Sequence, residues 1–219
     1  MLVRQVATPV RQRYRAQVRD EVKRAALRQL AEGGPQALSV NAIAKELGVS
    51  GPALYRYFSG RDELLTELVV DAYHDLAAAV GDAVGRARGR PARGRLRAFA
   101  RAYRDWAVAH PHRYGLLFVE PVPGYDAHAR RLVDASQCAM TVLVDVLDDA
   151  GAEVPSAALA RELGRWARSR GIDVSAPIAL RAVQIWARLH GFVSLEIGGN
   201  FTSMQLAPDK LFRAELEQL

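Results

Sequence analysis

The chain has 219 residues, of which 50% are hydrophobic, 7% aromatic and 25% charged, and its formal net charge is +6. This globular composition excludes a disordered, collagen-like or coiled-coil chain, and no uncharged apolar run approaches the roughly 18 residues of a membrane span. The chain has one cysteine, Cys138, and its basic N-terminal stretch lacks the apolar core of a secretory signal, so we expect a cytoplasmic protein.

The positive charge is concentrated in the first quarter of the chain. Residues 1–61 hold 11 Lys and Arg against 4 Asp and Glu, a net charge of +7, whereas the other 158 residues hold 19 against 20, a net charge of −1. A basic segment joined to a neutral one is typical of a polyanion-binding module attached to a second domain.

Apolar residues recur with helical spacing along the chain, which predicts an all-α fold. In the first helix an apolar residue returns every fourth position from Val18 to Leu30, and Gly33-Gly34-Pro35 end it. Ser39 then has the character of an N-cap for a helix over residues 40–47.

Two further helices complete the first part of the chain. Gly48 is the expected left-handed residue after helix 40–47, and Ser50 can cap a short helix over residues 50–57. A long helix begins at Arg61 and runs to about Val84. A basic loop over residues 85–95 follows, and the remaining helices are expected at 91–109, 111–118, 126–150, 156–170, 176–198 and 208–218.

Helix 40–47, its turn and helix 50–57 together make a helix-turn-helix. The turn needs a small residue that tolerates a left-handed backbone, which Gly48 supplies, and the helix crossing needs apolar residues. Those residues are Ala44, Leu47, Val49, Leu54 and Phe58. In this motif the second helix enters the major groove of DNA, with its first residues facing the bases.

The segment SVNAIAKELGVSGPALYRYFSGRDELL, residues 39–65, closely resembles the DNA-binding signature of the tetracycline-repressor (TetR) family. The similarity extends without gaps over about residues 14–70. It implies that Ser39, where the family often has Thr, meets a phosphate through its hydroxyl and backbone N–H. It also implies a phosphate clamp that contains Tyr55, Tyr57 and Arg61, with Arg61 replacing the usual Lys and Tyr57 the frequent His.

The same resemblance assigns the base-facing positions. The residues at the start of the second helix are small or hydroxylated, namely Ser50, Gly51, Pro52 and Ala53. Because none has a long polar side chain, we expect base selection to depend on Arg56, Tyr55, the N-terminal arm and DNA shape. Two questions stay open: both tyrosines can instead pack against neighbouring helices, and the arginine-rich arm, residues 1–15, either contacts DNA or is a solvated terminus.

The later segment WARLHGFVSLEIGGNF, residues 186–201, resembles a TetR subgroup named for a Trp-His-Gly signature, here Trp186, His190 and Gly191. This resemblance implies C-terminal helices that dimerise and enclose an inducer pocket. Helix 176–198 itself has two apolar stripes, so one can face its own domain and the other a second copy, and Gly191 would allow close helix approach.

Candidate pocket residues are aromatic or polar side chains on otherwise apolar faces. They are Tyr103, Trp106, His110, Tyr114, Phe118, Gln137, Met140, Trp166, Trp186 and His190. Taken singly, each is more typical of an ordinary core, but together they suit an apolar cavity with a few polar anchors.

Catalytic and metal-binding patterns are absent from the sequence. His110-Pro111-His112 lacks further ligands at metal spacing, and Cys138 lies mid-helix among apolar neighbours. We therefore expect no enzyme activity, no metal and no cofactor.

The sequence predicts a homodimeric repressor with a basic arm (1–15), a helix-turn-helix domain (16–61) and a ligand-binding and dimerisation domain (62–219). Its expected partners are a palindromic operator in double-stranded DNA, a second copy through helix 176–198 and the last helix, and a small apolar or amphipathic effector that releases the DNA, but no membrane. Two alternatives remain: a dimeric regulator without an inducer, and a small-molecule carrier whose DNA-binding module has decayed.

Overall fold

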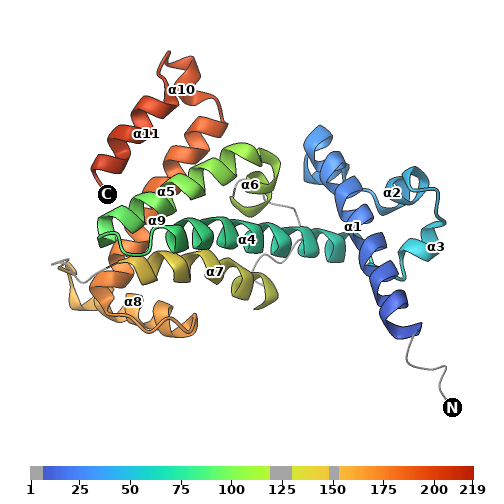
Figure 1. The fold of residues 1–219 in the computed structure, drawn as a ribbon, viewed down its shortest axis with the longest axis horizontal. Coiled ribbons are helices and arrows are strands. Elements are labelled where there is room, and N and C mark those ends of the chain that lie inside the picture. The colour runs from blue at the N-terminus through green and yellow to red at the C-terminus, as the bar shows by residue number, and fades with distance from the viewer. Residues whose placement is uncertain (1–6, 119–129, 148–152) are drawn as a thin grey trace. The chain divides into compact units, whose positions relative to one another are not determined.

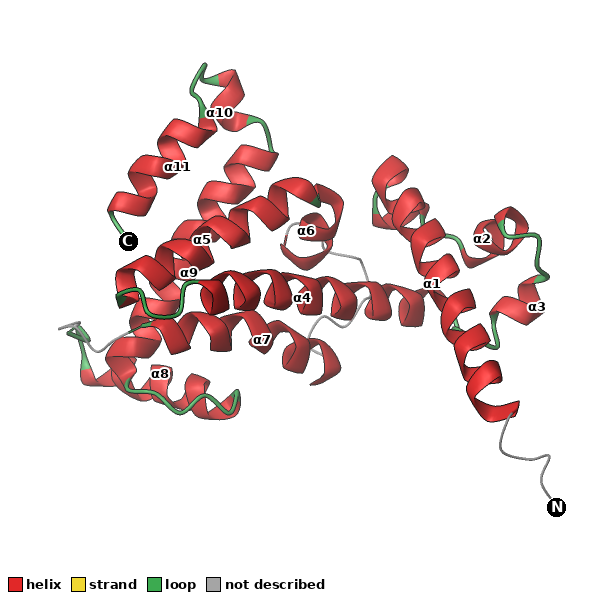
Figure 2. Cartoon of the chain, viewed as in Figure 1, coloured by secondary structure: helices red, strands yellow, loops and turns green. Residues whose placement is uncertain are grey.

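A computed structural model of the chain describes residues 7–118, 130–147 and 153–219. Every regular element in these ranges is a helix, and they contain no strand (Figure 2). This confirms the all-α class. None of the described helices is long and apolar enough to cross a membrane.

The chain divides into two compact units. Of the described residues, the first contains 7–69 and 115–118, and the second contains 70–114, 130–147 and 153–219. The division therefore falls after Val69, within the long helix α4 (Arg61–Arg86), rather than at residue 61.

The first unit is built from α1 (Ala7–Gly33), the 3-10 turn η1 (Pro35–Ala37), α2 (Val40–Glu46), α3 (Gly51–Leu54) and the start of α4. Helix α1 begins well before the predicted apolar stripe, so residues 7–15 of the expected arm are helical, and residues 1–6 lie outside the described residues. Residues 12–17 are exposed, and an exposed turn has no apolar periodicity by which a sequence pattern could reveal it.

The core of the first unit comes from all of its helices. Apolar side chains from α1, α2, α3 and α4 meet in one cluster: Val22, Ala25, Ala26, Leu30, Leu38, Val40, Ile43, Ala44, Leu54, Phe58, Leu64, Leu65 and Leu68. Of the predicted crossing residues, Ala44, Leu54 and Phe58 are in this core, Leu47 packs at its edge, and Val49 is 41% exposed. The prediction that Val49 packs where the two helices cross is therefore wrong.

The second unit contains the remainder of α4, α5 (Ala92–Ala109), the start of α6 (Pro111–Phe118), α7 (Arg130–Val146), α8 (Ala157–Ser169), α9 (Ala176–Ile197), α10 (Asn200–Ser203) and α11 (Pro208–Glu217). Helix α9 packs against α5, α7, α8 and α10 (Figure 1). The basic loop contracts to residues 87–91, because α4 and α5 both extend into the predicted segment 85–95. Parts of the predicted helix 126–150 lie outside the described residues.

Helix α11 is attached to its own unit by buried and half-buried contacts. The Arg104 guanidinium on α5 donates to both carboxylate oxygens of Glu196 on α9, at 2.7 and 2.6 Å, and to Asp209 on α11 at 2.7 Å. Arg104 also covers the ring of Phe212, which in turn contacts Phe192. Three helices are therefore joined at one arginine.

Candidate nucleic-acid interface and ligand site

The turn between α2 and α3 is closed by two backbone hydrogen bonds. The N–H of Val49 donates to the carbonyl of Ala44 at 3.0 Å, and the N–H of Gly48 donates to that of Lys45 at 3.2 Å. This is the Schellman arrangement, which requires a left-handed residue after the helix, and Gly48 has φ +67°. The left-handed residue predicted at the turn is confirmed, and the turn fixes where α3 starts.

Helix α3 separates a buried face from an exposed one. Leu54 and Phe58 are 1% exposed, whereas Tyr55 is 45% exposed and Arg56 and Pro52 are also exposed. The α-helix ends at Leu54, but backbone bonds from Arg56 to Ala53 and from Tyr57 to Leu54 continue the turn. The segment predicted as a helix over 50–57 is thus an α-helix from Gly51 to Leu54, followed by a tighter turn that ends at Tyr57.

Ser50 and Gly51 begin this helix. Ser50 occupies the N-cap position, but its side chain makes no capping hydrogen bond, which corrects the expectation that it caps the helix. Its exposed hydroxyl is not used by the helix end. Gly51 is half-buried, and a Cβ atom built on it would lie 3.3 Å from the side chain of Asn41, so α2 limits the size of the residue here.

Ser39 and Arg61 already have partners inside the protein. The Ser39 hydroxyl accepts from the N–H of Ala42 at 3.3 Å, and the Ser39 N–H donates to the side-chain oxygen of Gln29 at 2.9 Å. The Arg61 guanidinium donates to the carbonyl of Pro35 at 2.7 Å. The predicted capping by Ser39 is confirmed. A phosphate contact would use the hydroxyl proton of Ser39 and the remaining donors of Arg61.

Tyr57 has a mixed environment. It is half-buried and packs against the core cluster, while the Arg15 guanidinium lies 5.8 Å from the centre of its ring. The two alternatives for these tyrosines, facing solvent or packing against neighbouring helices, therefore divide between them: Tyr55 is exposed, and Tyr57 packs partly against the core.

A charge network that the sequence analysis missed holds the end of α3. Arg19 on α1 donates to the carbonyl of Tyr57 at 2.6 Å, lies 4.4 Å from the centre of the Phe58 ring and pairs with Glu67 on α4 at 3.0 Å. Lys23 also reaches Glu67, at 3.1 Å, and Glu67 is only 8% exposed. The signal in the sequence was a glutamate inside the apolar run LLTELVV, because a buried carboxylate needs cationic partners.

In the second unit, several predicted pocket residues form one ring cluster. The His190 ring stacks on Trp186 at 5.4 Å and on Tyr114 at 5.8 Å between ring centres, and the Tyr114 ring meets Tyr103 edge-on at 6.4 Å. The Tyr114 hydroxyl lies 2.8 Å from His190 Nδ1 and 2.9 Å from the Ser194 hydroxyl, and it donates to the His190 carbonyl at 3.1 Å. These bonds link α6 to α9.

Burial changes the proton affinities in this cluster. It raises the pKa of Tyr103 and of Tyr114, and it lowers the pKa of His190. Loss of water disfavours the charged form of each group. All three side chains are therefore neutral near pH 7, so the cluster is polar but uncharged.

The other predicted pocket residues are less closely connected. Trp106 is 7% exposed and its ring meets the exposed His110 at 5.7 Å. Half-buried residues make up the rest, with Gln137 and Met140 on α7 and Trp166 on α8. Phe118 is also half-buried, and it belongs to the first compact unit.

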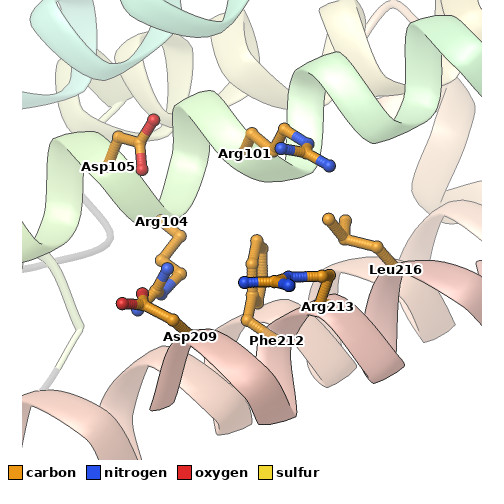
Figure 3. Close-up of a pocket in the computed structure, with 7 residues that line it drawn as sticks. All are labelled: Arg101, Arg104, Asp105, Asp209, Phe212, Arg213 and Leu216. Atoms are coloured by element: carbon orange, nitrogen blue, oxygen red, sulfur yellow. The ribbon is translucent and has the colours of Figure 1, made fainter. Parts of the chain in front are cut away.

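Two hollows in the described part of the chain are lined by none of the predicted pocket residues. One has a volume of about 230 Å³ between α5 and α11, and Figure 3 shows its lining: Arg101, Arg104, Asp105, Asp209, Phe212, Arg213 and Leu216. The other lies along α8, against Ala160, Arg161, Gly164, Arg165 and Arg168. Within the described residues, no group of three His, Cys, Asp or Glu side chains is placed to hold a metal ion.

Comparisons with protein families match both parts of the chain. Residues 24–68 match the family described as "Bacterial regulatory proteins, tetR family", and residues 96–219 match "Tetracyclin repressor-like, C-terminal domain". Neither description names a Trp-His-Gly subgroup, so that assignment stays a prediction.

Known proteins and structures are similar over most of their length. The HTH-type transcriptional regulator Rv1816 of Mycobacterium tuberculosis is 33% identical over 94% of this chain and 92% of its own. The solved structure of the regulatory protein SCO4313 is 42% identical, with a TM-score of 0.80 over 94% of this chain and 97% of that one. FadR from Bacillus subtilis, solved with stearoyl-CoA, shares the fold at 15% identity, with a TM-score of 0.62 over 90% and 95% of the two chains.

Proposed function

The chain belongs to the TetR family of bacterial transcriptional regulators. From this premise we propose that it is a homodimeric repressor that binds a palindromic operator and dissociates from it when a small molecule binds. Its matched relatives are named as regulators of transcription, so the chain is a regulator and not an enzyme.

The observation that carries the DNA-binding role is the division of α3 into two faces. Leu54 and Phe58 anchor the helix in the core, which leaves Tyr55 and Arg56 directed to solvent beside small residues at the helix start. Small residues permit close approach of the backbone to DNA, and an exposed arginine can reach guanine O6 and N7 or a phosphate. The ordered turn at Gly48 argues against a decayed module.

Arg61 and Tyr57 suit contacts to the DNA backbone. Both lie at the end of the helix-turn-helix, and the first quarter of the chain carries a net charge of +7, from 11 basic and 4 acidic residues. Phosphate contacts set the register of a protein on DNA but do not read its sequence. We therefore assign Arg61 and Tyr57 to affinity, and Arg56 to sequence preference.

Features of α9 support dimerisation. Among the described residues, a Cβ atom built on Gly191 meets no atom within 4 Å, so none of them makes the close helix approach expected at this glycine, which remains open to a second copy. Large apolar side chains are exposed nearby in sequence, with Leu195 at 47%, Met204 at 62% and Leu206 at 41%. The last helix contributes less to this proposal, since Phe212 and Leu216 are buried in its own unit.

The ligand-binding role rests on the second unit. Its ring cluster combines apolar surface with a few polar atoms, as effector sites do, and FadR provides an example of this fold with stearoyl-CoA bound. The effector would release DNA by favouring a spacing of the two α3 helices that no longer fits the operator. It can shift this equilibrium only as far as its affinity differs between the two states.

Salt dependence of DNA binding tests the assignment of Arg61. We would measure fluorescence anisotropy of a labelled duplex between 50 and 200 mM salt, values chosen because phosphate contacts respond steeply there. Arg61→Met should weaken binding to every duplex and reduce the slope of log affinity against log salt by about 1. Arg61→Lys should retain the slope, because it keeps the charge.

An arginine in the second unit provides the matched control. Arg213 is exposed on α11, so Arg213→Met removes the same charge without removing a phosphate contact. Its slope should equal that of the wild type. Equal reductions for Arg61→Met and Arg213→Met would mean that net charge alone drives the interaction, and would overturn the proposed interface.

A further inference from the structure

Helix α8 presents three arginines along one exposed face. Arg161, Arg165 and Arg168 follow one another at intervals of four and three residues, so their side chains share one face over about 10 Å of helix. All three are exposed, whereas Leu163 and Ala167 on the opposite side of α8 are buried. The arginines therefore lie outside the face that packs α8 onto its own unit.

These arginines have no acidic partner in the described part of the chain. No carboxylate there pairs with any of the three guanidinium groups, and they make no side-chain hydrogen bond. Like charges three and four residues apart on a helix repel one another and destabilise it. An anion from outside the chain would relieve this repulsion.

The same arginines border a groove of about 500 Å³, whose lining is completed by the small residues Ala160 and Gly164. We call it the arginine groove. A Cβ atom built on Gly164 would lie 3.2 Å from Arg168 Nη1, so this guanidinium lies against the bare backbone of the glycine. Glycine weakens the interior of a helix relative to alanine. Here it leaves room beside the guanidinium, and Glu162, the only acidic residue of α8, does not line the groove.

The spacing of the arginines favours a ligand with several linked oxyanions. Guanidinium groups bind phosphate and carboxylate oxygens in pairs. A single phosphate would have to draw the three like charges together, whereas a chain of phosphates presents oxygens along its length. An extended acidic peptide fits less well, because its side chains return to one face about every 7 Å, against rises of about 6 and 4.5 Å between successive arginines.

We propose that the arginine groove binds a short phosphate chain, such as that of a nucleoside triphosphate or of inorganic polyphosphate. The lining contains no aromatic or large apolar side chain, so it contacts the phosphate chain itself and not a base or acyl group attached to it. In the proposed homodimer the groove lies away from the two-fold axis, where the arginines of the two copies would repel one another. It is a site separate from the ring cluster.

Isothermal titration calorimetry of the full chain, at low salt and without DNA, tests this site with tripolyphosphate as the probe. Tripolyphosphate should bind at least about tenfold more tightly than orthophosphate, because it contacts more arginines. Adenosine triphosphate should equal tripolyphosphate. Equal affinity for orthophosphate, a clear preference for adenosine triphosphate, or tighter binding of a hexaglutamate peptide would each overturn the proposal.

Matched arginine variants locate the site. Arg165→Gln should weaken tripolyphosphate binding about tenfold, as loss of a charged hydrogen-bond donor does. Arg213→Gln removes the same charge from an exposed position on α11 and should leave binding unchanged. Equal losses would mean that net charge alone attracts the anion. A weaker dimer, or a smaller salt slope of DNA binding, in Arg165→Gln would assign this arginine to the second copy or to DNA; each of these results would overturn the proposal.

Gly164→Ala separates binding from stability. It should raise the midpoint of thermal unfolding, because alanine favours a helix, and yet weaken tripolyphosphate binding, because its Cβ displaces the Arg168 guanidinium. A higher midpoint with unchanged binding would show that the ligand does not lie over Gly164, and would contradict the proposed site.

Discussion

The network around Glu67 offers the sharpest test of how the DNA-binding unit is stabilised. Glu67→Ala removes a carboxylate that is 8% exposed and pairs with Arg19 at 3.0 Å and Lys23 at 3.1 Å. The two cations then lose this carboxylate, and their side chains are only 29% and 16% exposed. Removing one partner of a fully buried pair costs about 3–5 kcal/mol. Since Arg19 keeps some access to water, we expect about 2–3 kcal/mol.

The chain contains a matched control in the pair between Arg28 and Glu46. It also joins an arginine of α1 to a glutamate of the same unit, but its side chains are 57% and 41% exposed. Exposed pairs contribute only about 0.2–1 kcal/mol. Glu46→Ala should therefore have a much smaller effect than Glu67→Ala, although both remove one negative charge.

Thermal unfolding followed by circular dichroism at pH 7 measures both variants. For a chain of this size the loss expected for Glu67→Ala corresponds to a midpoint roughly 4–12 °C lower. Because Arg19 also holds the Tyr57 carbonyl, Glu67→Ala should weaken DNA binding as well, with little change in the salt slope. Equal midpoint losses for the two variants would refute the reasoning, since burial would then not determine the value of the pair.

Three further outcomes are expected. Gly48→Ala should lower the free energy of unfolding in urea by about 1–2 kcal/mol, because Gly48 has φ +67° and a residue with a Cβ atom is strained there. Gly60→Ala should be nearly neutral, because its added Cβ meets nothing within 4 Å and its backbone is not left-handed, and equal effects of the two substitutions would contradict this. Arg104→Met should lower stability by about 3 kcal/mol by leaving Glu196, 10% exposed, unpaired, while Asp209→Ala, at a side chain 77% exposed, should cost under about 1 kcal/mol. Burial lowers the pKa of His190, so on acidification the unfolded chain binds this proton before the folded one does, and stability should fall as the pH drops through about 6.5. Between pH 7.5 and 5.5 the urea midpoint of His190→Asn should therefore decline less than that of the wild type. An identical decline would exclude His190 as the cause.

Sequence patterns located most helices because their ends carry local signals. Ser39, Ser156 and Ser175 each accept a capping hydrogen bond, and glycine follows helix α2 in the left-handed conformation. Such signals act within one turn of the chain, so they can be read without knowledge of the fold. The start of α1 and the four-residue α10 have no apolar stripe and were missed for that reason.

Partners far apart in the sequence could not be predicted in the same way. The bonds from Arg19 to Tyr57 and from Arg104 to Glu196 join residues 38 and 92 positions apart, and no local pattern specifies which of many arginines meets which acid. The same limit applies to the ligand site. Aromatic residues could be nominated from the sequence, but the contacts of the Tyr114 hydroxyl with His190 and Ser194 emerge only once the helices are packed.

Selection of genomic fragments tests the central claim most directly. Purified protein would be unfolded and refolded to remove any bound effector, immobilised, and incubated with fragmented genomic DNA at near-physiological salt, and the retained DNA would be sequenced. A homodimeric regulator should enrich a palindromic site whose half-sites lie about one DNA turn or more apart. Retention of bulk DNA alone, without an enriched site and lost as salt rises, would contradict the account.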